Sequence, residues 1–70
     1  GELIVLRVTA SDRFFFGERL TIARGEDARQ YVTVVEVVAI KGTRIEARSV
    51  PVLQKHRVEV GDRVVWFVPP

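Results

Sequence analysis

The chain contains no cysteine, no methionine and no asparagine among its 70 residues, and it has a single histidine. Without cysteine it can form neither a disulfide nor a thiolate metal site. One histidine alone excludes the usual zinc ligand sets, and no loop carries the alternating acidic residues of a calcium site. We therefore expect no bound metal and no cofactor.

The sequence also lacks the residues from which a catalytic centre is built. His56 lies between Lys55 and Arg57, with no neighbouring carboxylate to orient it, and the chain has only two serines. A nucleophile needs a base within hydrogen-bond reach and a third group that orients this base. We therefore expect His56 to be a solvated side chain in a basic loop, with no catalytic residue and no enzymatic activity.

Long apolar runs are missing as well. The apolar runs are only about five residues long, whereas a membrane-spanning helix needs about 20. We therefore expect no transmembrane segment, and no signal-peptide pattern is present. The chain starts at Gly1 rather than Met, which favours a domain excised from a longer protein. The sequence leaves the compartment open.

Instead, the chain shows period-two alternation of apolar and polar residues from end to end, with many β-branched residues. Gly17 interrupts the second apolar run, which is typical of a bulge or a barrel corner. Short strands separated by turns indicate a small all-β barrel of five to six strands, SH3-like or OB-like, without a substantial helix. We expect residues 1–70 to form one domain with strands at 2–9, 14–24, 31–40, 43–50, 58–60 and 63–68.

The register of the hairpin at Lys41-Gly42 can be predicted from charge. A two-residue loop in a regular hairpin would place Glu36 on the same face as Ile45 and Ala47. Burying an unpaired carboxylate costs several kcal/mol, as an order of magnitude. We therefore predict a three-residue loop with Gly42 in the left-handed conformation, which turns Glu36 outward.

Alternation also predicts the core. One face of each expected strand carries apolar residues that should point inward. The expected core consists of Ile4, Leu6, Val8, Phe16, Leu20, Ile22, Val35, Val37, Ile45, Ala47, Val58, Val60, Val64 and Trp66.

Three segments together resemble a known kind of domain. They are Phe16-Gly17-Glu18-Arg19, the strand at 33–37 and the segment Val58-Glu59-Val60-Gly61-Asp62-Arg63-Val64-Val65. Their order over residues 14–68 resembles small β-barrel domains of bacterial cell-envelope and flagellar-assembly proteins. The chain departs from that pattern in two places. It has Gly17-Glu18 where the family has Gly-Asp, and residues 51–57 match no element of the family pattern. The resemblance implies a bacterial structural module rather than an enzyme.

An outward aromatic ring beside arginine is a typical composition for a protein–protein hot spot. Adjacent strand residues point in opposite directions, so 14–16 and 66–67 must each present at least one ring outward. We therefore predict a non-catalytic protein-interaction or assembly module that docks another domain or subunit. The expected interaction residues are Phe14, Phe15 and Phe67, with Arg13 and Arg57 at the rim.

Single-stranded nucleic acid is the main alternative partner, because small barrels bind it through basic grooves and aromatic platforms. The net charge of +2 is small and its basic residues are mixed along the chain, so charge gives this alternative little support. Its candidate residues are Tyr31, Arg44, Arg48, Lys55, His56 and Arg57. The residues also leave open a homo-oligomer, and a designed β-barrel with no biological function.

Overall fold

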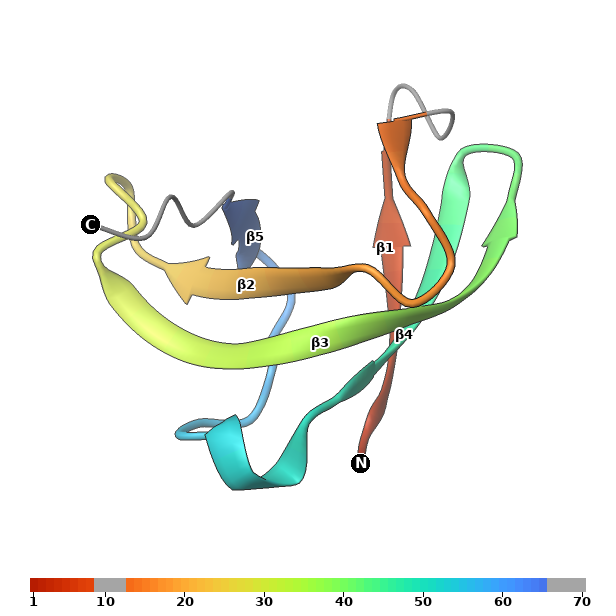
Figure 1. The fold of residues 1–70 in the computed structure, drawn as a ribbon. Helices are drawn as coiled ribbons and strands as arrows, with labels where there is room; N and C mark the ends of the chain where they lie inside the picture. The colour runs from red at the N-terminus through yellow and green to blue at the C-terminus, as the bar shows by residue number, and fades with distance from the viewer. Residues whose placement is uncertain (9–12, 66–70) are drawn as a thin grey trace.

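A computed structural model describes residues 1–8 and 13–65 of the chain. It is all-β, as expected, with five antiparallel strands in one curled sheet that forms a half-barrel (Figure 1). The strands are β1 (Leu3–Arg7), β2 (Arg19–Arg24), β3 (Gln30–Lys41), β4 (Arg44–Ser49) and β5 (Arg63–Val65), and a short 3-10 helix, η2 (Pro51–Leu53), follows β4. No helix among the described residues is long and apolar enough to cross a membrane.

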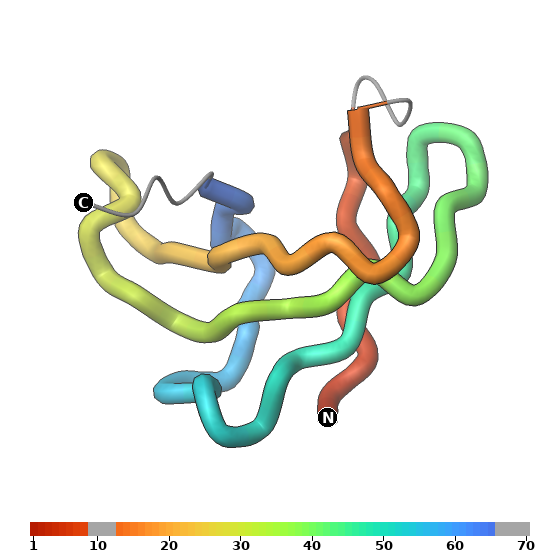
Figure 2. Tube along the Cα trace, in the orientation of Figure 1, coloured from red at the N-terminus to blue at the C-terminus, as the bar shows by residue number. Residues whose placement is uncertain are grey.

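The sheet has the order β1-β4-β3-β2-β5, so β1 and β5 form its two edges. The long strand β3 is shared: its first part pairs with β2 and its second part with β4. From η2, the segment 54–62 crosses behind β3 to reach β5 (Figure 2). The backbone N–H groups of Lys55 and His56 donate to the carbonyl of Val32, at 2.9 and 3.1 Å, which ties this segment to the barrel.

Two irregularities allow β3 to serve both neighbours. The register between β2 and β3 shifts where Ile22 pairs with Thr33 and Ala23 with Tyr31, which leaves Val32 as an extra residue. The register between β3 and β4 shifts at Val38. An extra residue on one strand bends it and increases its twist. The bends let β3 curve around a core that it could not enclose as a straight strand (Figure 1).

The bulge at Val38 corrects the predicted hairpin. Lys41 pairs with Arg44, so the loop has two residues, Gly42 and Thr43, rather than three. Gly42 has φ +63°, at the first central position, where type II′ hairpin turns need a positive φ. Glu36 nevertheless points away from the core, because the extra residue Val38 restores the alternation. The charge argument therefore predicted the correct face of Glu36 with the wrong loop.

Most of the expected core is buried. Ile4, Leu20, Ile22, Val35, Val37, Ile45 and Ala47 lie in the core, and Leu6, Val8, Val58 and Val64 pack against it half-buried. Phe16 and Val60 were predicted wrongly, since they are 78% and 108% exposed, and Trp66 lies outside the described residues. Alternation missed two core residues, Phe14 and Val32.

The wrong predictions for Phe16 and Val60 have the same physical cause. The expected strand at 14–24 begins only at Arg19, and no strand forms at 58–60, because the chain turns at Gly17 (φ +85°) and at Gly61 (φ +98°). Alternation of side chains holds only where the backbone is extended. Phe14 therefore occupies the core in place of Phe16, and Val60 lies at the exposed turn.

Candidate functional site

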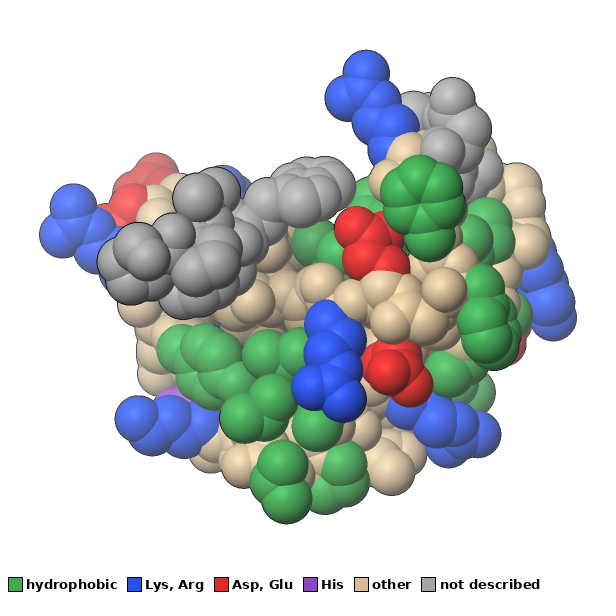
Figure 3. Space-filling view, in the orientation of Figure 1, with side chains coloured by type: hydrophobic (Ala, Val, Ile, Leu, Met, Phe, Trp, Pro, Cys, Tyr) green, Lys and Arg blue, Asp and Glu red, His purple; other side chains and the backbone are tan. Residues whose placement is uncertain are grey.

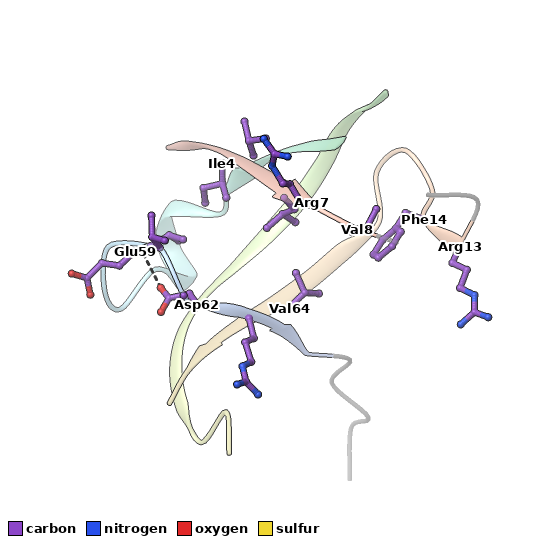
Figure 4. A pocket seen from close by; sticks show the side chains of 14 residues that line it. Ile4, Arg7, Val8, Arg13, Phe14, Glu59, Asp62 and Val64 are labelled. Atoms are coloured by element: carbon purple, nitrogen blue, oxygen red, sulfur yellow. Dashed lines mark hydrogen bonds between the residues drawn. The ribbon is translucent and has the colours of Figure 1, made fainter. Parts of the chain in front are cut away.

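The strands at the two edges of the sheet are not hydrogen-bonded to each other, and a groove of about 790 Å³ lies between them. Its apolar wall is formed by Ile4, Leu6, Val8, Phe14, Val58 and Val64. Figure 4 shows Ile4 and Val64 pointing into this space from β1 and β5, with Val8 and Phe14 at one end and Glu59 and Asp62 at the other. An apolar concavity with a few polar groups at its rim is the usual form of a binding site.

The charges at the rim of the groove are predominantly positive. Arg7, Arg13 and Arg63 line it together with Glu59 and Asp62. Arg7 and Arg13 form no ion pair with another described residue. Both acidic side chains, in contrast, are already engaged by Arg24 of β2, through contacts of 2.7 Å with Asp62 and 3.0 Å with Glu59. Among the residues that the structure describes, the rim of the groove therefore offers unpaired cations and no unpaired carboxylate.

Arg24 and Asp62 fix one wall of the groove to the barrel, and we call this pair the latch. The guanidinium donates twice to the carboxylate, at 2.7 and 2.9 Å, and once to the carbonyl of Arg57, at 2.8 Å. The other partner of Asp62 is the backbone N–H of Glu59, at 2.8 Å. The Asp62 side chain is 3% exposed, so the turn at 59–62 is tied to β2 by a buried carboxylate.

These contacts lower the pKa of Asp62 below its ordinary value of 3.8. The hydrogen bond from Arg24 is the main cause, and the backbone N–H of Glu59 adds to it, while burial of the carboxylate opposes both. The same pairing raises the pKa of Arg24. The latch is therefore ionised in the folded domain at neutral pH.

The predicted protein-interaction residues are only partly brought together. Arg13 and Phe14 line one end of the groove, but the Phe14 ring is 7% exposed and belongs to the core, so it is not an exposed docking residue. Phe15 is 68% exposed on the adjoining loop, where its N–H donates to Glu18 at 3.1 Å. Arg57 is exposed and directly precedes Val58 of the groove wall. Phe67 lies outside the described residues.

The residues predicted for nucleic acid fall into two groups. Tyr31 lies beside the segment after η2, because its hydroxyl donates to the carbonyl of Leu53 at 2.6 Å, and Lys55 and His56 follow there. Arg44 and Arg48 are on the outer face of β4, opposite Arg7 and Leu3 of β1. Arg57 is bound to Arg24 through its carbonyl. The structure therefore does not unite these six residues in one surface.

Hydrophobic side chains are also exposed away from the groove. In the view of Figure 3 they gather over β3 and η2 and, separately, over the loop at 14–18, with charged side chains between them. The exposed residues in these two areas are Tyr31, Val52, Leu53, Phe15 and Phe16. These two areas are alternative docking surfaces to the groove.

The sequence contained only a partial signal for the groove. Val58 and Val64 were expected to be core residues, and Asp62 was named only as part of the segment 58–65 that carries the resemblance. Nothing local indicates that Arg24 reaches Asp62, which is 38 residues away. Within residues 1–8 and 13–65, no group of three or more histidines and acidic residues could hold a metal ion.

Comparisons of the chain with protein-family models, with curated proteins and with solved structures find no match. The resemblance to small barrel domains of bacterial envelope and flagellar-assembly proteins therefore stays a prediction.

Proposed function

We propose that this domain is a non-catalytic protein-interaction module that docks another protein through the groove between β1 and β5. The observation that carries the proposal is the half-open barrel: apolar residues of β1, of β5 and of the segments next to them line a groove of about 790 Å³ that no other described part of the chain fills. Apolar pockets with a polar, charged rim are where interface hot spots concentrate. We further propose, from the sequence resemblance alone, that the domain belongs to a larger bacterial protein associated with the cell envelope.

Two exposed valines allow a matched test of the groove. Val60 lines the groove and Val52 lies on η2, outside it, and both side chains are almost fully exposed. Neither contributes to the core, so Val60→Asp and Val52→Asp should both fold. We expect peptides selected from a random phage-displayed library on the wild-type domain to bind Val60→Asp about tenfold or more weakly, and Val52→Asp within about twofold.

Dissociation constants by fluorescence anisotropy of the selected peptides, with circular dichroism of both variants, would check this. Selection of no peptide would contradict the proposal. Equal binding to both variants would exclude the groove as the docking site, and a loss confined to Val52→Asp would place docking on the area over β3 and η2 instead.

One observation favours the second candidate, a nucleic-acid-binding barrel. Arg7 pairs with Arg44 across β1 and β4, and Arg44 pairs with Lys41 across β4 and β3, so three cations lie in a row. A hollow of about 430 Å³ lies beside this row, lined in part by Val5 and Thr43. Lys41 is paired with Glu46 at 3.4 Å, whereas Arg7 and Arg44 form no ion pair with a described residue. Like charges placed opposite each other on a sheet are destabilising, and an anionic ligand would relieve the repulsion between Arg7 and Arg44.

Labelled single-stranded DNA and RNA separate the two candidates. If the domain docks proteins, we expect no micromolar binding of either oligonucleotide at about 50 mM salt. Micromolar binding that falls steeply by about 200 mM salt, because released counterions drive it, and that is weakened further in Arg44→Ala, would replace the docking proposal. Lys55→Ala, outside the row, is the matched control for loss of one positive charge.

A further inference from the structure

The free edge of β1 carries backbone groups that no described residue satisfies. The N–H of Val8 donates to Thr43 and the carbonyl of Glu2 accepts from Ser49, both at 2.9 Å. Because hydrogen-bonded residues alternate along an antiparallel strand, the backbone groups of Ile4 and Leu6 also face β4. Those of Leu3, Val5 and Arg7 therefore point to the other edge, and β1 pairs with no described strand except β4.

Nothing in β1 prevents a further strand from pairing with this edge. Native edge strands are usually protected by proline, lysine, a bulge or a covering segment. β1 has the sequence Leu3-Ile4-Val5-Leu6-Arg7, without proline or lysine, and its register with β4 is regular throughout. Across the groove, β5 pairs only with β2 among the described strands. The wall of the barrel is therefore interrupted between two strand edges (Figure 4).

The groove's side chains define what an added strand would have to carry. One face of that strand would meet Ile4 and Leu6 of β1 and Val64 of β5, so alternate residues should be apolar. Arg7, Arg13 and Arg63 stand at the rim, and Arg24 is paired with both Glu59 and Asp62, so the arginines outnumber the carboxylates by four to two. Electrostatic complementarity therefore favours acidic residues at the ends of the strand.

We propose that the partner of this domain is an extended segment of another protein, with alternating apolar residues and acidic ends, which adds to the free edge of β1 as a sixth strand and continues the barrel wall toward β5. This inference rests on the proposed docking function and specifies its mode. Main-chain hydrogen bonds to Leu3, Val5 and Arg7 would provide affinity, and the apolar groove would select the alternate side chains.

A synthetic peptide, Glu-Val-Thr-Val-Thr-Val-Glu with blocked ends, can probe this edge in the intact 70-residue chain. We expect saturating peptide to slow amide hydrogen exchange at Leu3, Val5 and Arg7 by about tenfold or more, because these N–H groups become hydrogen-bonded. The amides of Ile4 and Leu6, already bonded to β4, should change little. The same peptide with lysine in place of both glutamates should bind about tenfold more weakly.

The substitution Val5→Pro tests the backbone contact directly. Proline removes one N–H from the free edge without removing a bond to β4, and edge strands tolerate it in that orientation. We expect Val5→Pro to weaken peptide binding about tenfold, whereas Val5→Ala, which keeps the N–H, should bind within about threefold of wild type. Nuclear magnetic resonance spectra of both variants would establish that each is folded.

The outcomes separate this inference from the docking function on which it rests. Binding that is lost in Val60→Asp but gives no protection at Leu3, Val5 and Arg7 would overturn the added strand and keep the groove. Protection of these amides that rises with domain concentration, without peptide, would show a second copy of the chain as the occupant and overturn the partner segment. If the probe does not bind and no library peptide depends on Val60, both proposals fail.

Discussion

Val37→Asp is expected to abolish the cooperative unfolding transition of the domain, whereas Val38→Asp should retain it. Val38 is the extra residue at the bulge, so Val37 pairs with Ala47 in the core while Glu36 pairs with Arg48 on the outer face. In a regular hairpin with the same two-residue loop, Val38 would stand opposite Ala47 and Val37 would face outward, because a shift by one residue moves every side chain of a strand to the opposite face. The two substitutions therefore distinguish the bulged register from the regular one.

The expected cost exceeds what a domain of this size can tolerate. An unpaired buried carboxylate costs several kcal/mol, and the side chain that Val37→Asp replaces is 1% exposed. The total stability of a domain this small is about 4 to 10 kcal/mol. Urea denaturation followed by circular dichroism would measure the change.

Val38→Asp is the matched control for the added charge. Val38 is half-buried at the bulge and does not belong to the core. We expect this substitution to leave a cooperative transition. If Val38→Asp abolishes the transition and Val37→Asp does not, the bulge does not set the register of β3.

Loss of the latch is expected to have the next largest effect. Asp62→Ala should lower the thermal midpoint at pH 7 by about 5 to 15 °C, because it removes charge-assisted hydrogen bonds from Arg24 and the acceptor for the Glu59 N–H. Differential scanning calorimetry would measure this. Asp27→Ala is the matched control, since Asp27 also pairs with an arginine, at 2.9 Å, but is 61% exposed. Exposed pairs contribute little, so its midpoint should change by about 2 °C or less.

The latch also makes stability depend on pH in a defined direction. The pKa of Asp62 is lower in the folded than in the unfolded chain, so the unfolded state binds a proton more readily. This carboxylate therefore stabilises the fold fully above the unfolded value, near 3.8, and the contribution is lost as pH falls through the lower, folded value. The difference in midpoint between wild type and Asp62→Ala should shrink below about pH 4. A difference that stays constant from pH 7 to pH 2.5 would contradict this role of the ionised Asp62.

The sequence alone was enough to predict core residues and the face of Glu36 in the segments where the backbone is extended. Period-two alternation placed Ile4, Ile22, Val35 and Ile45 in the core, because the side chains of a strand alternate between its faces. The cost of burying a charge placed Glu36 on the outer face. Both inferences depend only on the geometry of an extended strand and on which side chains can be buried. The order of apolar and charged residues in the sequence gives both directly.

Tertiary structure alone decided where alternation stops and which strands become neighbours. Because the chain turns at Gly17 and at Gly61, Phe14 rather than Phe16 lies in the core, and Val60 is exposed. The groove exists because β1 pairs with β4, and β5 with β2, which leaves both with a free edge. Such pairings join residues far apart in the chain, as Arg24 and Asp62 are joined. Pairing energies of this kind depend on the packing of the whole sheet, so no local pattern records them.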